Sequence, residues 1–264
     1  MRNSKAIIIT GASRCLGAAV SRWLGSTGAA VSLVARSKKD LEIVADEIKQ
    51  SGGKPLAIHA DISDPEACDR IVVKTVDQFG RLDAVVNNAG ILAPLNTIDV
   101  ADPAAWRYNL EVNIMAPFYL TRAALSELRK QAGHIVNVSS GAAKTAIEGA
   151  SAYCAAKAAL NHFTRVLAAE EPKITAVTVR PGVVDTRMQK ILREEGHQVM
   201  PARWTDYYRN LKDQGKLEPP EVPGRVIAWL ALDAPNDLTG RFLSYDDPEI
   251  AQPAVDFFQN NGNR

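Results

Sequence analysis

Short apolar runs alternate with longer segments of mixed polarity along the first two thirds of the chain. The apolar runs are rich in valine and isoleucine, which is typical of strands buried on both faces of a parallel sheet, and they cover residues 6–10, 30–35, 55–60, 84–87, 134–139 and 174–179. Helix-length segments separate them at 14–27, 38–51, 64–79, 103–131 and 151–171. This alternation predicts one α/β domain over residues 1–264, with a doubly wound parallel sheet of about seven strands and helices on both faces.

Residues 186–220 interrupt this pattern. They are charged and aromatic, contain Trp204, Tyr207 and Tyr208, and have no strand-like run. Ligands of doubly wound folds bind beyond the carboxyl ends of the strands, so an insertion after the strand at 174–179 predicts a substrate lid. A surface excursion without function is the alternative. The chain then ends with a predicted helix near 220–232 and a strand near 240–244.

Composition and charge exclude several classes of protein. The 264 residues include 46% hydrophobic and 23% charged residues, as in ordinary globular proteins, and the formal net charge is +1 without any block of like charge. We therefore expect no nucleic-acid surface. No apolar stretch approaches the ~18 residues that span a bilayer, and no signal peptide is recognisable, which favours a soluble cytoplasmic protein without membrane contact. Cys15, Cys68 and Cys154 lack metal-ligand spacing, so we expect reduced thiols and no metal site.

A glycine-containing turn follows the first strand and opens the first helix. Residues 10–17 read Thr-Gly-Ala-Ser-Arg-Cys-Leu-Gly. Free backbone N–H groups at such a helix start can bind a dinucleotide pyrophosphate; Gly11 permits the sharp turn and Gly17 allows close helix–strand packing. Tight turns need glycine for other reasons too, so this turn alone leaves a purely structural interpretation open.

The candidate chemistry lies in Ser140, Tyr153 and Lys157. Tyrosine and lysine four residues apart share one face of a helix, so the ammonium can lie near the phenol. A free phenol has a pKa of about 10, and lowering it by roughly 3 units for proton transfer at neutral pH needs about 4 kcal/mol. The nearby lysine, helped by the positive ring of a bound cofactor, could supply that free energy. Ser140 ends the fifth strand, where its hydroxyl could hold a carbonyl oxygen. An isolated Tyr-x-x-x-Lys pair would more simply be a surface pair.

The end of the second strand indicates which dinucleotide binds. NAD enzymes normally place an acid there, on the ribose 2′-hydroxyl, whereas this chain has Ala35 followed by Arg36. The guanidinium fork of Arg36 suits a phosphate, and Arg14 could reach the same side. This favours NADP(H), although two arginines on surface turns are often only solvated.

Several motifs in a fixed order identify a family resemblance. Residues 87–90 (Asn-Asn-Ala-Gly) close the fourth strand, Ser140 precedes Tyr153 by thirteen residues, and residues 181–186 (Pro-Gly-Val-Val-Asp-Thr) follow the sixth strand. With the glycine turn, these motifs resemble the short-chain dehydrogenase/reductase family over nearly the whole chain. The resemblance implies a Rossmann-type fold, nicotinamide chemistry on a ketone, and a homodimer or homotetramer.

The resemblance also implies a role for each matching residue. Tyr153 matches the catalytic acid/base, Lys157 its activator, Ser140 the substrate-orienting hydroxyl, and Asn113 the residue that holds a water linking the lysine to solvent. The cofactor-binding set that it implies, besides Tyr153 and Lys157, is Gly11, Ser13, Arg14, Leu16, Gly17, Arg36, Ser37, Asp61, Ile62, Asn87, Ala89, Gly90, Pro181, Gly182, Val184 and Thr186.

One position departs from the family pattern. Cys15 stands where the family usually has a second glycine, which lets the backbone approach the pyrophosphate. The thiol could weaken cofactor binding, shift the turn or point away harmlessly. We expect binding to survive, because one small side chain costs less than the summed pyrophosphate contacts.

The later chain is similar to one narrower branch, the fungal benzil reductases, which are close to sepiapterin reductases. The similarity lies in residues 159–163, 181–188 and 240–248 and implies reduction of a diketone to an α-hydroxyketone by NADPH. Met188 and the three lid aromatics would suit a flat aromatic ketone, or could simply pack the lid onto the body. The alternatives are a sepiapterin-type or 3-oxoacyl-thioester reductase, and a non-catalytic NADPH-binding sensor.

Overall fold

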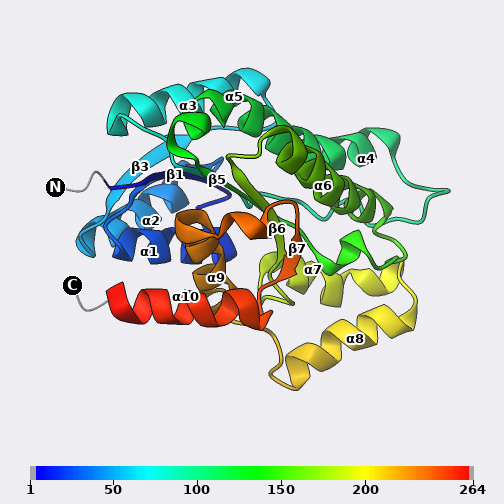
Figure 1. Ribbon diagram of the computed structural model, residues 1–264. Coiled ribbons are helices and arrows are strands. Elements are labelled where there is room, and N and C mark those ends of the chain that lie inside the picture. Colours follow the sequence, from blue (N-terminus) through cyan, green and yellow to red (C-terminus); the bar gives the residue numbers. More distant parts are fainter. Residues whose placement is uncertain (1–3, 262–264) are drawn as a thin grey trace.

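The computed structural model describes residues 4–261 and contains one sheet of seven parallel strands in the order β3-β2-β1-β4-β5-β6-β7 (Figure 1). The strands are β1 (Ala6–Thr10), β2 (Ala30–Ala35), β3 (Lys54–His59), β4 (Ala84–Asn87), β5 (His134–Val138), β6 (Thr175–Arg180) and β7 (Phe242–Ser244). The strand order reverses between β1 and β4, and in open α/β sheets ligands bind beyond the carboxyl ends of the strands at such a reversal.

Helices cover both faces of this sheet. The helices α1 and α9 pack on each other below the sheet in Figure 1 with α10, and α3, α5 and α6 lie above it. The helices are α1 (Cys15–Ser26), α2 (Lys38–Gln50), α3 (Pro65–Phe79), α4 (Pro103–Leu110), α5 (Ala116–Gln131), α6 (Ser151–Glu170), α7 (Arg187–Glu194), α8 (Ala202–Asp213), α9 (Glu221–Asp233) and α10 (Pro248–Asn261). The predicted doubly wound fold is therefore confirmed.

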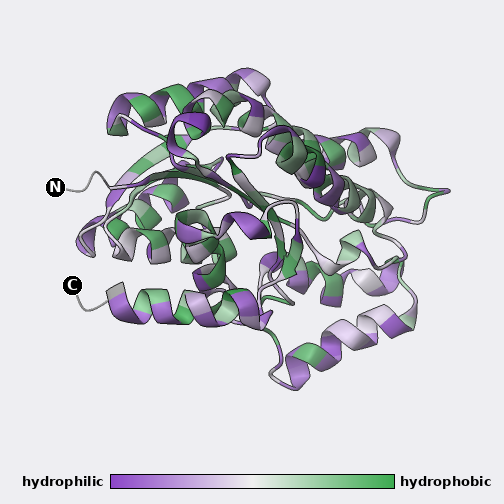
Figure 2. Cartoon of the chain, viewed as in Figure 1, coloured by the Kyte–Doolittle hydropathy of each residue, from purple (hydrophilic) through white to green (hydrophobic). Residues whose placement is uncertain are grey.

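The core lies in two layers, one on each side of the sheet. Ile7 and Ile9 of β1 join the cluster beneath α1 and α9, and Ile8 between them joins the cluster beneath α3 and α5. Successive strand residues point to opposite faces, and both faces here are buried. Figure 2 shows the result, with green central strands and helices that carry both green and purple surfaces.

The predicted helix at 103–131 is wrong in one respect. It is divided into α4, a π-helical turn at Glu111–Met115, and α5. Pro117 explains the break, because proline has no N–H to donate and its ring clashes with the carbonyl four residues earlier. That carbonyl belongs to Asn113, one of the predicted catalytic residues. Single π-turns of this kind are frequent at functional sites.

The last part of the chain contains one helix that was not predicted. α10 follows β7 and buries Ile250, Ala254 and Phe258 at helical spacing. The other predicted elements are present, with ends displaced by a residue or two. Residues 187–213 form α7, a 3₁₀ turn at Gly196–Gln198, and α8. None of residues 187–213 pairs as a strand, and one isolated bridge joins Val184 and Glu218, which flank them.

Candidate active site

Helix α6 places Tyr153 and Lys157 at the carboxyl end of β5. The Ser140 hydroxyl, just beyond β5, is hydrogen-bonded to the Tyr153 phenol. The Lys157 ammonium donates to the carbonyl oxygen of Val138 at 2.9 Å and lies 5.6 Å from the centre of the Tyr153 ring. The structure therefore brings together the three side chains that the sequence singled out.

Without a cofactor, burial decides the ionisation of these groups. Burial raises the pKa of Tyr153 to about 12, with the hydrogen bond from Ser140 opposing the rise, and burial lowers the pKa of Lys157 to about 8. The predicted lowering of the phenol pKa by the lysine is thus not supplied by this chain's own groups. The physical reason is that desolvation of a buried phenolate outweighs the stabilisation by its neighbours. Without a cofactor, the raised pKa keeps the Tyr153 phenol protonated at neutral pH, next to the Lys157 ammonium.

Buried polar side chains fix α6 on the sheet. Ser139 donates to Asn161 at 2.6 Å, and Asn137 donates to Thr164 at 2.8 Å. Asn87, predicted to line the adenosine side, donates its amide to Asn137 at 2.8 Å and so extends this chain of hydrogen bonds to β4. Buried hydrogen bonds of this kind fix rotation and register, and they hold the helix face that carries Tyr153.

The glycine turn lies at the reversal between β1 and β4. Gly11 has φ +67°, and a Cβ on Gly17 would lie 2.2 Å from the Gly11 carbonyl oxygen, so only glycine fits at these two positions. The Thr10 hydroxyl accepts hydrogen bonds from the backbone N–H groups of Asn88 and Ala89 at 3.0 and 3.1 Å. Thr10 thereby joins the two loops that flank the reversal. This role of Thr10 was not predicted, although a polar residue at the end of a buried strand was a signal for it.

Cys15 lies in a backbone conformation that favours glycine. Its φ is +47°, within the left-handed region, and its side chain is half-buried. The cysteine therefore adopts a strained conformation that glycine would adopt without strain. On either side, Leu16 is buried and the exposed Arg14 side chain has no ion-pair partner within residues 4–261. Ser13 is half-buried in the same turn.

Arg36 extends from the end of β2 into solvent. Its Nη1 lies 2.9 Å from the hydroxyl of Tyr108 on α4 and 3.8 Å from Oδ2 of Asp61, and its side chain is 60% exposed. Asp61 also accepts from Ser63, and Ser37 caps the start of α2. The guanidinium is thus held only by exposed contacts and stays accessible. Tyr108 is a neighbour that the sequence analysis missed.

Asn113 is fully buried within the π-helical turn. Its amide nitrogen donates to the Ile91 carbonyl at 2.8 Å and to Oδ1 of Asn109 at 2.9 Å. A Cβ on Gly90 would lie 2.8 Å from Oδ1 of Asn113 and 3.7 Å from Nζ of Lys157, so Gly90 separates these two groups. Asn109 was not predicted, although it lies four residues before Asn113 and hence one helical turn away.

The segment after β6 is closely packed where the sequence predicted the nicotinamide side. Gly182 has φ +75°, and a Cβ there would lie 2.6 Å from the Tyr245 ring. Val184 is buried, and the Thr186 hydroxyl caps α7 by accepting from the backbone of Gln189. Pro181 precedes this turn, directly after the end of β6.

Residues 187–213 cover Tyr153. Trp204 and Tyr153 pack against one apolar cluster centred on Leu92, Ala150 and Met200. The Trp204 and Tyr208 rings are stacked, with centroids 6.3 Å apart and planes 24° apart. Met188 joins the same cluster, whereas Tyr207 is 45% exposed. The predicted lid aromatics therefore differ in burial, because Trp204 packs in the cluster that also contains Tyr153 of α6, whereas Tyr207 is exposed.

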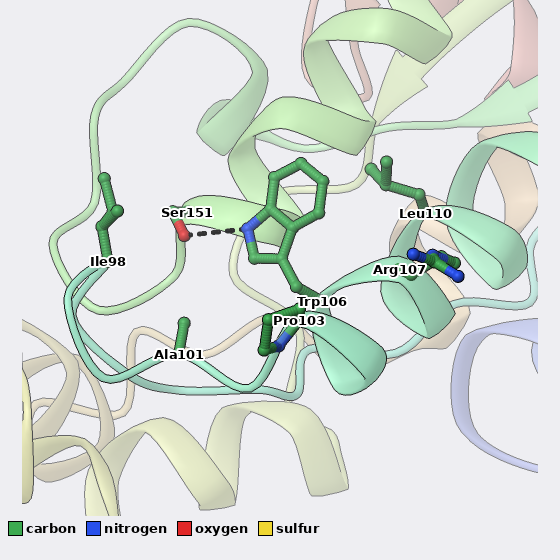
Figure 3. Close-up of a pocket in the computed structure, with 7 residues that line it drawn as sticks. All are labelled: Ile98, Ala101, Pro103, Trp106, Arg107, Leu110 and Ser151. Carbon is green, nitrogen blue, oxygen red and sulfur yellow. Dashed lines mark hydrogen bonds between the residues drawn. The ribbon is translucent and has the colours of Figure 1, made fainter.

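A separate hollow lies on another side of the first turn of α6 (Figure 3). Its volume is about 450 Å³, and the Trp106 indole N–H donates to Ser151 at 3.2 Å within it. It is lined by Ile98, Ala101, Pro103, Trp106, Arg107, Leu110 and Ser151. None of the three candidate catalytic side chains lines this hollow, so it is distinct from the site.

Residues 4–261 lack both a membrane-spanning helix and a metal-binding cluster. No helix there has the length and apolar character needed to cross a membrane. Within the same residues, no three His, Cys, Asp or Glu side chains are grouped so as to hold a metal ion.

Comparison with known proteins identifies the family. The short chain dehydrogenase family model matches residues 5–196. An uncharacterized oxidoreductase of Saccharomyces cerevisiae is 36% identical over 94% of this chain and 98% of its own, and its crystal structure matches with a TM-score of 0.90. A benzil reductase ((S)-benzoin forming) of the same yeast is 36% identical over 93% of this chain and 97% of its own.

A further solved structure carries a cofactor. It is a metagenomic short-chain oxidoreductase in complex with NADP, 30% identical, with a TM-score of 0.70 over 86% of this chain and 90% of that one. The family binds nicotinamide cofactors and acts on CH–OH or C=O groups of small molecules. With its seven-stranded sheet and its Ser-Tyr-Lys arrangement, this chain is an oxidoreductase of the short-chain dehydrogenase/reductase family.

Proposed function

We propose that this chain is an NADPH-dependent carbonyl reductase in which Tyr153 is the proton donor. The observation that carries the proposal is the neutral phenol of Tyr153, hydrogen-bonded to Ser140 and next to the Lys157 ammonium at the sheet edge. The turn at Gly11 and Gly17 supports the binding of a dinucleotide, because its close backbone packing holds the start of α1 at the reversal of strand order, where free N–H groups can bind a pyrophosphate.

Each side chain has a definite task in the reduction. The bound reduced nicotinamide supplies a hydride to the carbonyl carbon. Tyr153 donates its proton to the carbonyl oxygen, and Ser140 orients that oxygen by a hydrogen bond. Lys157 stabilises the phenolate that remains, and Asn113 holds the water through which the proton is replaced from solvent.

NADP(H) is the cofactor that we assign to this chain. Arg36 and Arg14 offer exposed guanidinium groups for a 2′-phosphate, and Ala35 at the end of β2 presents no carboxylate to repel it. Asp61 lies at the end of β3 and contacts Arg36 only at 3.8 Å, so it leaves the guanidinium fork accessible. The rest of the proposed cofactor site is Ser13, Leu16, Ser37, Ile62, Ala89, Gly90, Pro181, Gly182, Val184 and Thr186.

The substrate class that we propose is a flat aromatic ketone or diketone. The Trp204 and Tyr208 rings stack, and Trp204 packs against the same cluster as Tyr153. Aromatic rings near the phenol suit a flat aromatic substrate, because such a molecule can stack on them. The relative that forms (S)-benzoin from benzil supports a diketone in particular. In this proposal residues 186–220 are the substrate lid, and the chain works as a homo-oligomer.

A panel of ketones tests the proposal. NADPH oxidation is followed with benzil, other aromatic diketones, sepiapterin and an acetoacetyl thioester, using Tyr153→Phe as the control. We expect turnover of a diketone, and loss of about 10²–10⁴-fold in kcat with NADPH binding retained in the variant. Preference for sepiapterin or the thioester would reassign the substrate. NADPH binding without turnover of any ketone would instead indicate a sensor.

A further inference from the structure

The loop between Ser140 and Tyr153 contacts the start of α8 through a single carboxylate. Glu148 accepts a hydrogen bond from the Trp204 indole N–H at 2.6 Å, and its other oxygen forms an ion pair with Arg203. Two consecutive lid residues are thus bound by one side chain of the loop that connects the two candidate catalytic residues.

The other contacts of residues 187–213 are of a different kind. The two ends of this segment meet just after β6, where the backbone N–H of Asp185 donates to the Glu218 carbonyl oxygen at 3.0 Å. Nζ of Lys212 also lies 2.9 Å from Oδ2 of Asp185. Between these ends the packing on the body is apolar. Among the described residues, Glu148 provides the polar side-chain contacts between α8 and the loop 141–150.

We infer that Glu148 is a positioning residue, which holds Trp204 and the start of α8 against the loop that carries Tyr153 and so closes the substrate side of the site. The inference rests on the proposed function for its kinetic consequence. Glu148 does not touch the reacting atoms; it acts through the position of the Trp204 ring.

The strength of the contact suits a closure that must open in each turnover. The side chains of Glu148 and Arg203 are 42% and 64% exposed, and exposed ion pairs contribute little. The indole N–H bond to a carboxylate is stronger because the acceptor is charged. Both interactions end when one carboxylate moves, while the ends of the segment stay attached beside Asp185.

Four variants test the inference. Glu148→Ala removes both interactions, Glu148→Gln keeps a neutral acceptor, and Trp204→Phe keeps a ring but removes the N–H donor. Glu194→Ala is the matched control, because it removes an ion pair with Lys190 that lies within α7 and does not reach the loop. Each protein is measured for the KM and kcat of the best ketone, for the Kd of NADPH, and for the rate of tryptic cleavage within residues 187–216 without substrate.

We expect Glu148→Ala to raise the KM for the ketone and the cleavage rate each by about fivefold, with smaller changes in kcat and an unchanged Kd of NADPH. Glu148→Gln and Trp204→Phe should lie between this variant and the wild type, and Glu194→Ala should match the wild type. Equal cleavage rates and KM values for Glu148→Ala and wild type would overturn the inference. Cleavage is measured without substrate, so it still decides the matter if no ketone is turned over.

Discussion

Replacement of Cys15 by glycine separates strain in the turn from crowding of the cofactor. At φ +47° an L-residue is destabilised by about 1–2 kcal/mol, while glycine costs about 0.5–1 kcal/mol in backbone entropy. The net gain for Cys15→Gly is therefore about 0.5–1 kcal/mol, reduced somewhat by the loss of contacts of a half-buried thiol. For a domain of this size, that corresponds to a rise in Tm of about 1–4 °C.

A second residue in the same conformation is the matched control. Ala132, at the end of α5, also has φ +47°, and it is exposed and far in sequence from the glycine turn. Ala132→Gly should raise Tm in the same way without affecting the dinucleotide. Strain at position 15 is present with and without cofactor, so it cancels in the Kd. Only contact of the side chain with the pyrophosphate changes the Kd.

Thermal unfolding of the two variants measures the strain, and NADPH titration measures the crowding of the cofactor. We expect both to unfold at higher temperature, and only Cys15→Gly to bind NADPH more tightly, by about two- to fivefold, or about 0.4–1 kcal/mol. A higher Tm for Ala132→Gly together with an unchanged or lower Tm for Cys15→Gly would refute the strain argument. An equal Kd in wild type and Cys15→Gly would refute crowding.

Three further outcomes follow from the site and the core. Because burial lowers the pKa of Lys157 to about 8, the kcat/KM for ketone reduction should fall above that pH as the ammonium loses its proton. Lys157→Arg stays charged and should show no such fall, and a flat wild-type profile up to pH ~9 would contradict the prediction. Ala35→Asp combined with Arg36→Ser should reverse the preference from NADPH to NADH in kcat/KM, and retained NADPH selectivity would show that the assignment is wrong. Burial lowers the pKa of His134 to about 4, so between pH 4 and about 6.5 the unfolded chain binds one proton that the folded chain does not. The free energy of unfolding should therefore fall on acidification through this range, and it should fall less steeply in His134→Asn. Urea titrations at several pH values would measure both.

The sequence predicted the sheet well because both faces of its strands are buried. Continuous apolar runs such as Ile7-Ile8-Ile9 are typical of strands buried on both faces of a parallel sheet. The apolar residues at helical spacing between these runs predicted the helices. The π-helical turn was not predicted, because the segment has helical length and spacing although it contains Pro117. The helix α10 was not predicted either, because Pro248 and Pro253 resemble breakers, although Pro248 is in the first turn, where proline is tolerated.

The site could be predicted where spacing along one element decides the geometry. Tyr153 and Lys157 share a helix face because they are four residues apart, and Ser140 is near them because β5 ends there. The ionisation of Tyr153 could not be predicted, because it depends on burial in the cluster around Leu92 and Met200, which are distant from Tyr153 in sequence. Glu148 gave no signal for the same reason, since its partners come fifty-five and fifty-six residues later.

The backbone pairing of Asp185 with Glu218 brings both ends of the lid segment to one place on the protein. A segment that leaves and re-enters at adjacent residues can change in length or composition without stretching the strands to which it is attached. Residues 186–217 can therefore be replaced without altering the sheet, the glycine turn or the Ser-Tyr-Lys arrangement. In the proposed function residues 186–220 are the substrate lid, so new substrate preferences can arise there by replacement of one contiguous piece of chain.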